Sequence, residues 1–278
     1  MSAQAPYNNY PAGSQRPWVP AVGISWQIVL NAPLHIDPRQ PSVTPDVEVY
    51  DIDLFDNSPE TVASLHSLGK KVICYFSAGT YEEWRPDASQ FPKADLGKAM
   101  DDWPGERWLN LKSETVRAIM AQRIKLAAEK GFDAIDPDNV DGYSNKNGLG
   151  LKKADSIDFI KFLSREASKY GMSIGLKNAG EIIRDVIDVV DFQVNEECVK
   201  YNEGQTFSAF IRANKAVFHI EYPRGAPGSV SAKSRTSISN AKGTENFSTL
   251  LKTMDLDGWV QFCDGQEFKT RTGSAVEK

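Results

Sequence analysis

The sequence has few cysteines and histidines, and this scarcity limits the metal and redox chemistry that it can support. Its three cysteines among 278 residues are too few for a disulfide framework. The three histidines are scattered, and none has a cysteine or a second histidine at zinc-binding spacing. We therefore expect no metal site and no cofactor.

The sequence also has no excess of positive charge and no long apolar run. Its 32 basic and 37 acidic residues give a net charge of −5, and no basic block suggests a nucleic-acid partner. No apolar stretch approaches the roughly 18 residues that span a bilayer. The first residues lack the basic-then-apolar pattern of a signal peptide, so the protein is expected to be either cytoplasmic or to have had its signal removed.

The chain is expected to form one large domain behind a flexible lead. Residues 1–22 are rich in Pro, Gly, Ser, Asn and Gln, which favours a flexible segment. Residues 23–278 are enough for a single α/β barrel, which needs about 250 residues. We expect a monomer.

After the lead, short apolar runs alternate with helical patterns. The runs are rich in β-branched and aromatic residues, as is typical of buried parallel strands. The predicted strands are 26–30, 47–55, 71–78, 132–136, 173–178, 189–195, 216–222 and 258–263. The predicted helices are 58–69, 113–131, 154–171, 179–187, 204–213 and 244–254.

Eight strands alternating with helices predict an α/β fold of the (β/α)8 TIM-barrel type. The competing architecture is an open doubly wound sheet, which usually carries a glycine-rich turn after its first strand. The segment "WQIVLNAPLHID" has no glycine at that point. The long segment 79–112 is loop-rich and aromatic, and in a barrel it would lie over the active face.

Polar residues gather at the predicted carboxyl ends of the strands, where barrel enzymes place their active sites. The densest group is "FDAIDPDNVDGY", in which Asp136, Asp138 and Asp141 lie within six residues. Crowded carboxylates shift one another's pKa values apart, which leaves one protonated and one ionised. Such a pair is what hydrolysis of a glycosidic bond requires.

Each of these features has a structural alternative. The alternative for Asp141 is a simple turn with Gly142, and that for Asp51 and Asp53 is a solvated strand face or hydrogen-bond partners inside the barrel. The tryptophans of segment 79–112, at 84, 103 and 108, could stack on sugar faces or only cover the rim. The acids could hold Mg²⁺ or Ca²⁺, although we expect no metal.

Six strand-end motifs occur in an order that resembles a known family. They are "VYDIDLFD" (49–56), "KVICYFSAGTYEEWRPD" (71–87), "GERWLN" (105–110), "GFDAIDPDNVDGY" (131–143), "GLKN" (175–178) and "VNEEC" (194–198), followed by "FHIEY" (218–222). Together they resemble glycoside hydrolase family 114, the endo-α-1,4-polygalactosaminidases. The resemblance runs from about Trp26 to Tyr222.

The resemblance implies a (β/α)8 barrel that cleaves internal bonds of α-1,4-linked galactosamine polymers, partly N-acetylated, such as galactosaminogalactan, a biofilm-type exopolysaccharide. It also implies secretion. The acidic pair of the family would fall on Asp138 and Glu196, with Glu197 as the neighbour that a one-residue slip would select. The other positions implied or suggested for the sugar site are Asp51, Asp53, Tyr75, Trp84, Asp136, Asn139, Lys177, Glu221 and Tyr222.

These observations leave the mechanism and two other functions open. One acid would protonate the leaving oxygen while the other attacks the sugar or activates water, and retention is favoured for the α-linked substrate. A protonated amine of the substrate would be held by Asp51, Asp53 and Asp136. The alternatives are a non-catalytic carbohydrate-binding barrel and a lyase or aldolase that forms a Schiff base on Lys177.

Overall fold

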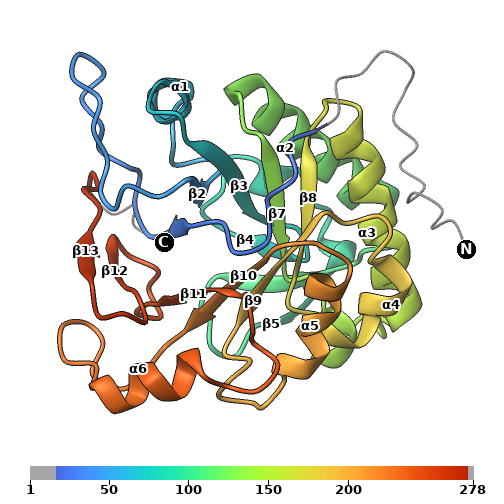
Figure 1. Cartoon of the computed structure of the whole chain (residues 1–278). Coiled ribbons are helices and arrows are strands. Elements are labelled where there is room, and N and C mark those ends of the chain that lie inside the picture. The colour runs from blue at the N-terminus through green and yellow to red at the C-terminus, as the bar shows by residue number, and fades with distance from the viewer. Residues whose placement is uncertain (1–16, 275–278) are drawn as a thin grey trace, which may run out of the picture.

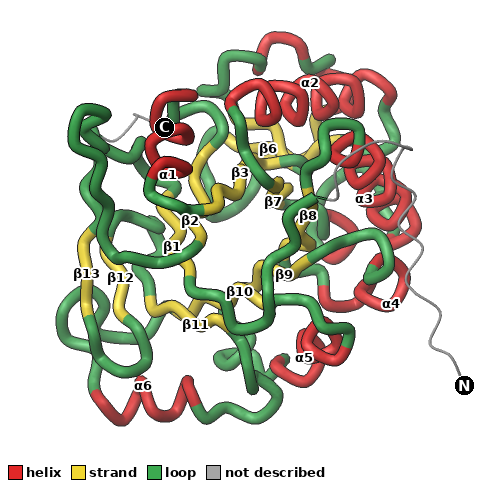
Figure 2. Tube along the Cα trace, turned by 45° about the horizontal axis from the view of Figure 1, so that its top comes forward, coloured by secondary structure: helices red, strands yellow, loops and turns green. Residues whose placement is uncertain are grey.

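A computed structural model describes residues 17–274, and in it a curled parallel sheet forms the centre of the molecule (Figure 1). The sheet has ten strands in the order β1-β2-β3-β7-β8-β9-β10-β11-β12-β13. Every neighbouring pair from β1 to β11 is parallel, and only β12 and β13 add on in antiparallel fashion. The strands follow one another around a ring (Figure 2), so the (β/α)8 prediction is confirmed.

The sheet has eight parallel strands, and seven of them agree with predicted runs within a few residues at each end. Their bounds are β1 Trp26–Val29, β2 Val49–Asp53, β3 Lys71–Ser77, β7 Ala134–Asp138, β8 Ser173–Lys177, β9 Phe192–Glu196, β10 Val217–Glu221 and β11 Ser248–Leu251. The helices that follow are α1 Pro59–Ser67, α2 Glu114–Lys130, α3 Lys153–Ser168, α4 Ile183–Val186, α5 Gly204–Arg212 and α6 Ala232–Ser239.

The helix ends show why these segments are helical. Ser58 and Ser113 cap α1 and α2, because their side chains accept hydrogen bonds from the backbone N–H groups of Thr61 and Val116. Gly131 ends α2 in the left-handed conformation, at φ 90°. The sequence signals for these two helices were therefore read correctly.

The last barrel strand was predicted wrongly. Residues 244–254 were expected to be a helix, but β11 lies there, and the run 258–263 instead contains the antiparallel strand β12, Trp259–Gln261. A parallel strand is buried on both faces, so its short apolar run has no alternation to distinguish it from a helix. Strand β13 spans Glu267–Lys269, and α6 was not predicted.

The long segment after β3 is loop-rich, as expected, but also contains three short strands. It contains a small antiparallel sheet in the order β4-β6-β5, with β4 at Thr80–Glu82, β5 at Leu96–Ala99 and β6 at Glu106–Leu109. Two buried arginines fasten this insertion to the barrel. Arg85 binds Asp53 through two hydrogen bonds of 3.0 and 2.6 Å, and Arg123 binds Asp87 through two of 2.8 Å.

The lead was expected to be flexible over residues 1–22, but residues 1–16 lie outside the described part of the chain. Of the remainder, Pro17 and Pro20 are buried. Trp18 packs against the cluster that fills the barrel interior, and the Lys71 ammonium lies 5.9 Å from its ring centroid. No helix of residues 17–274 is long and apolar enough to cross a membrane.

The barrel is completed by side chains at one seam. Within residues 17–274 the strand order does not pair β1 with β11. Instead Trp26 donates from Nε1 to the Ser248 carbonyl at 2.7 Å. Lys252, fully buried, donates from Nζ to the carbonyls of Ile28 at 2.8 Å and Asp257 at 2.7 Å and to the Gln27 side chain at 3.1 Å. One side-chain nitrogen thus serves three buried acceptors, of which the Ile28 carbonyl belongs to β1.

We expect Lys252→Met to lower the free energy of unfolding by about 3 kcal/mol, because it leaves buried carbonyls without a donor. The matched control is Lys269→Met, which removes an exposed ammonium from β13 and should leave stability unchanged. Urea denaturation followed by circular dichroism measures both. Equal stability of the two variants would show that Lys252 does not hold the seam.

Candidate active site

Three charged side chains meet at the carboxyl ends of three neighbouring strands. Asp138 ends β7, Lys177 ends β8 and Glu196 ends β9. The Lys177 ammonium lies 3.2 Å from Asp138 Oδ2 and 3.2 Å from Glu196 Oε2. The lysine side chain is only 2% exposed, so the two carboxylates share one cation that water hardly reaches.

This arrangement sets an upper limit on the separation of the two acids. Because both oxygens lie 3.2 Å from one nitrogen, they cannot be farther apart than twice that distance. The limit for this pair of oxygens, Asp138 Oδ2 and Glu196 Oε2, is therefore 6.4 Å. Retaining glycosidases place their carboxyl groups about 5–5.5 Å apart, and inverting ones place them about 6.5–9.5 Å apart.

Both oxygens of Asp138 accept hydrogen bonds. Tyr75 donates from its hydroxyl to Oδ2 at 2.9 Å, and the backbone N–H of Asn139 donates to Oδ1 at 2.7 Å. Burial and the neighbouring Asp138 raise the pKa of Tyr75 well above its usual value, so the phenol stays a donor. The surroundings of Asp138 therefore suit a carboxylate.

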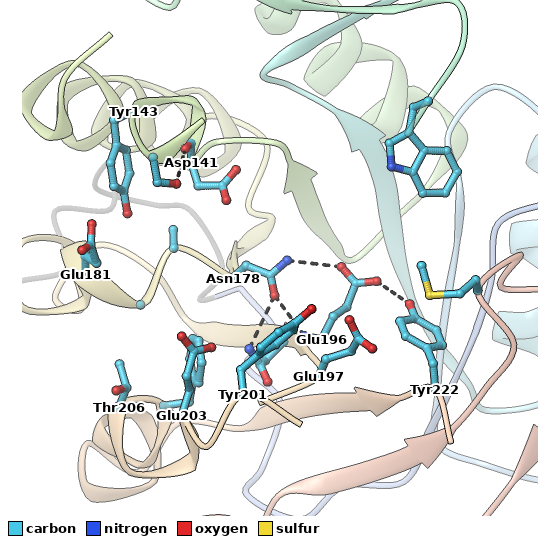
Figure 3. Close-up of a pocket in the computed structure, with 17 residues that line it drawn as sticks. Asp141, Tyr143, Asn178, Glu181, Glu196, Glu197, Tyr201, Glu203, Thr206 and Tyr222 are labelled. Atoms are coloured by element: carbon cyan, nitrogen blue, oxygen red, sulfur yellow. Dashed lines mark hydrogen bonds between the residues drawn. The ribbon is translucent and has the colours of Figure 1, made fainter. Parts of the chain in front are cut away.

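Glu196 is held in a similar way and reaches the open cavity (Figure 3). Tyr222 donates a short hydrogen bond to Oε1, and Asn178 donates from Nδ2 to Oε2 at 3.2 Å. Burial raises the pKa of Glu196, but Lys177 and the donated hydrogen bonds outweigh it and hold the pKa below its usual value. Glu196 is therefore ionised while the cavity holds no sugar.

Below this group lie two further acids that face each other. Asp51 on β2 and Asp136 on β7 are fully buried, and none of their carboxyl oxygens receives an N–H or O–H donor from elsewhere in residues 17–274. Burial and then the neighbouring Asp136 raise the pKa of Asp51 well above its usual range. Burial also raises the pKa of Asp136 to about 7, although Lys177 opposes the shift. The two carboxyls are therefore best described as a pair that shares a proton.

The charge state of Lys177 argues against a Schiff-base role. Burial lowers the pKa of this lysine, but Asp138 and Glu196 together raise it well above its usual value. A Schiff base needs an unprotonated amine. Lys177 is thus a fixed cation between two acids rather than a nucleophile.

The cavity has a volume of about 670 Å³ and an acidic lining. No lysine, arginine or histidine of the described chain is among its lining residues. Trp103 and Tyr201, which are 48% and 60% exposed, stand at its rim, whereas Trp84 does not line it. The acids that line it are Asp141, Glu181, Glu196, Glu197 and Glu203.

Several residues suggested for the sugar site lie elsewhere. Asp53 is occupied by Arg85 and also accepts the backbone N–H of Phe55 at 2.8 Å. Glu221 lies on the outer face of β10, where it accepts from the Val199 N–H at 2.8 Å. Glu196 and Glu197 both line the cavity, but Glu197 binds Lys200 at 2.7 Å, whereas Glu196 lies 3.2 Å from Lys177.

Sequence reasoning passed over some cavity residues, although it did place Asn178 at the end of a predicted strand. Glu181 and Glu203 come from segments beyond β8 and β9, and Tyr143 and Tyr201 from loops, where no strand register applies. Only the folded loops bring these side chains to the same wall (Figure 3).

One group of side chains has the composition of a metal site. The ligand atoms of Cys198, His219 and Glu221 lie within 4.8 Å of one another. The imidazole is already used on both sides, since Nε2 lies 2.9 Å from Glu221 Oε1 and Nδ1 lies 3.0 Å from Thr249 Oγ1. His219 and Glu221 also alternate with Phe218 and Ile220, which fill the barrel interior, so the group faces away from the cavity.

Comparisons with known proteins agree with this geometry. The family model described as glycoside-hydrolase family GH114 matches residues 8–268. A crystal structure of Aspergillus fumigatus Ega3 in complex with galactosamine is 50% identical, with a TM-score of 0.85, over 92% of this chain and 100% of that one. The glycoside hydrolase domain of PelA from Pseudomonas aeruginosa is 12% identical, with a TM-score of 0.61, over 84% and 95% of the two chains, and shows the fold alone. A comparison with curated protein sequences gives no match.

We expect Asp51→Asn to gain stability relative to the wild type as the pH rises. An acid whose pKa is higher in the folded state than in the unfolded one loses folded-state stability between those two values, here from about 4 upward. Asparagine cannot ionise and can still donate to Asp136. The difference in melting temperature between variant and wild type should therefore be more favourable at pH 7.5 than at pH 4.5, and calorimetry at both values measures it. A difference that shrinks with rising pH would contradict the shared proton.

Proposed function

Because this chain belongs to glycoside hydrolase family 114, it is a glycoside hydrolase, and we propose that it cleaves internal bonds of α-1,4-linked galactosamine polymers with Asp138 and Glu196. The observation that carries the proposal is the pair of carboxylates on either side of the buried Lys177. The galactosamine bound to Ega3, which is 50% identical, supports the choice of sugar.

The limit on the separation of the acids supports a retaining mechanism. Asp138 attacks the anomeric carbon and forms a glycosyl ester while the leaving oxygen takes a proton from Glu196. Water then hydrolyses the ester, with Glu196 now acting as the base and Asp138 leaving as a carboxylate. Each proton that Glu196 donates in the first step is thereby returned in the second.

The surroundings of the acids support this division of roles. Asp138 is the less exposed, at 17% against 25%, and the donors on both of its oxygens keep its charge in place. Glu196 lines the cavity and can exchange protons with the solvent there. A bound sugar displaces water from Glu196, which raises its pKa and allows it to carry the proton that the first step requires.

The acidic lining supports a cationic substrate. A galactosamine polymer carries protonated amines, and the cavity offers carboxylates without a competing cation among its described lining residues. The amine was expected to bind Asp51, Asp53 and Asp136, but Arg85 occupies Asp53 and the other two are fully buried. We assign that role to Glu203, which has no ion pair in the described chain, whereas Glu181 pairs with Lys153 at 3.0 Å.

A polymeric substrate also supports an extracellular site of action. Polysaccharides of the galactosaminogalactan or biofilm-matrix type lie outside the cell, so we propose that the enzyme is secreted.

We further propose a monomer, because a single chain supplies both acids and the whole cavity lining. Light scattering that gives twice the mass of 30.8 kDa would contradict the monomer, and activity confined to the cell lysate of the native source would contradict secretion.

We expect Asp138→Asn and Glu196→Gln each to lower kcat by at least about 10³-fold on partially deacetylated α-1,4-galactosamine polymer. Mass spectrometry of the products measures the loss, and proton NMR of the first products should show the α-anomer. The matched control is Glu129→Gln on α2, an exposed acid that does not line the cavity. Oligomers from either active-site variant at the wild-type rate would refute the acid pair.

We expect Glu203→Gln to raise KM several-fold on the deacetylated polymer and to leave it unchanged on the fully acetylated one, because only the former carries a charge at this position. Wild-type KM should also rise between 20 and 500 mM salt, which screens the attraction. Glu245→Gln, an exposed acid outside the cavity lining, serves as control. Equal effects of Glu203→Gln on both polymers would remove the amine from the explanation.

A further inference from the structure

A hydrogen-bond chain connects the insertion with the catalytic Asp138. It begins at Glu106 on β6, whose Oε2 accepts from Thr80 Oγ1 on β4 at 2.7 Å. The Thr80 hydroxyl contacts the Ser77 hydroxyl at the end of β3. Ser77 Oγ in turn accepts from Asn139 Nδ2 at 3.0 Å, and the Asn139 backbone N–H donates to Asp138 Oδ1 at 2.7 Å.

The chemistry of the groups gives this chain one direction. The Asn139 amide nitrogen only donates, so Ser77 accepts from it and is free to donate to Thr80. Thr80 then donates to Glu106, and a carboxylate only accepts. Ser77 and Thr80 are almost fully buried, and Glu106 is 9% exposed, so water competes little for these bonds. The ionised carboxylate thus fixes the orientation of every group up to Asn139.

The backbone at Asn139 needs such support. Its φ of 59° lies in the left-handed region, which is uncommon for residues other than glycine. Ala78 and Gly79 donate from their N–H groups to the Asp138 carbonyl at 2.9 and 3.0 Å. The packing is so close that a Cβ on Gly79 would lie 1.7 Å from the Asn139 carbonyl oxygen. The β3–β4 turn therefore holds the catalytic strand end directly.

We propose that Glu106 is a positioning residue for the reaction, which acts through Thr80, Ser77 and Asn139 to hold the N–H group that binds Asp138 Oδ1. The proposal rests on the proposed function, since Asp138 must be the nucleophile for its orientation to affect the rate. Glu106 itself does not line the cavity, so substrate binding does not depend on it.

The charges around Glu106 make its influence depend on pH. Burial raises the pKa of Glu106 to about 7, although the hydrogen bond from Thr80 opposes the shift. Glu82 and Asp138 raise it further, and Arg85 lowers it. Glu82 is itself paired with two arginines, since its Oε1 lies 2.9 Å from Arg85 Nη2 and its Oε2 lies 3.7 Å from Arg123 Nη1. The Tyr75 phenol near Glu106 is uncharged, because its pKa is raised well above its usual value. Below about pH 7 Glu106 takes up a proton, and Thr80 then loses its charged acceptor.

The test compares Glu106→Gln and Thr80→Val with Thr80→Ser, which keeps the hydroxyl, on the deacetylated polymer. At pH 8.5 we expect kcat to fall about tenfold in the first two variants and KM to change less than twofold, since misorientation of a catalytic group affects the chemical step. Thr80→Ser should stay close to the wild type. Glu83→Gln removes an exposed carboxylate from the same insertion and is the matched control.

The pH dependence separates positioning from a merely structural effect. At pH 5.5 the wild-type Glu106 is itself neutral, so the ratio of wild-type kcat to that of Glu106→Gln should approach one. Other groups that titrate in this range act on both enzymes and cancel in the ratio. A ratio that does not change with pH, or wild-type kcat in both Thr80→Val and Glu106→Gln, would overturn the proposal.

Two controls keep the outcome interpretable. If Glu106→Gln does not fold, as judged by circular dichroism, the Thr80→Val and Thr80→Ser pair carries the test, because valine has the shape of threonine without its hydrogen bonds. Asp138→Asn is measured alongside. Full activity in Asp138→Asn would refute the proposed function, whereas its loss combined with unaffected Glu106 and Thr80 variants would refute only the positioning role.

Discussion

The position of one buried ammonium organises the whole active site. Lys177 lies between Asp138 and Glu196, and without it two carboxylates on adjacent strands would repel each other in a region of low dielectric. With it, the two carboxyl groups stay close together on either side of one cation. Lys177 does not act as a nucleophile, since the two acids raise its pKa well above the usual value and keep it protonated.

The same cation explains why the acids beneath it do not ionise together. Asp51 and Asp136 share the barrel interior with Asp138 and Glu196, and one lysine cannot balance four negative charges. Retaining a proton between Asp51 and Asp136 removes the excess without another basic residue. The interior thus separates into a charged layer, where the reaction occurs, and a partly protonated layer, which supports it from below.

The sequence allowed the fold to be predicted from the order and register of its strands, whereas the pair Asp138 and Glu196 was implied by the resemblance to the family. Seven parallel strands were located from short apolar runs, and in a barrel their last residues must converge, which brought together Asp138, Lys177 and Glu196. Pairwise contacts across long separations could not be predicted in this way. Asp53 has the same strand-end position as the other acids, but Arg85, which lies 32 residues later in the insertion, occupies it. Glu221 was assigned to the wrong face of its strand for a different reason, since a one-residue shift in a strand moves a side chain to the opposite face.

A hydrolase of a cationic polymer must attract positive charge without losing control of its own acids. This protein meets both demands by separating acids according to their exposure. Those on the cavity wall, such as Glu203, remain in contact with water and cost little to keep ionised. The two proposed catalytic acids, Asp138 and Glu196, instead accept hydrogen bonds from Tyr75, Tyr222, Asn178 and the backbone of Asn139. Rigid strands and the insertion hold these donors in position before the substrate binds. Little reorganisation of the site is therefore needed when the bond is cleaved. On the proposed mechanism the turn into the insertion after β3 contributes to catalysis, because its Ala78 and Gly79 N–H groups bind the carbonyl of Asp138, the proposed nucleophile.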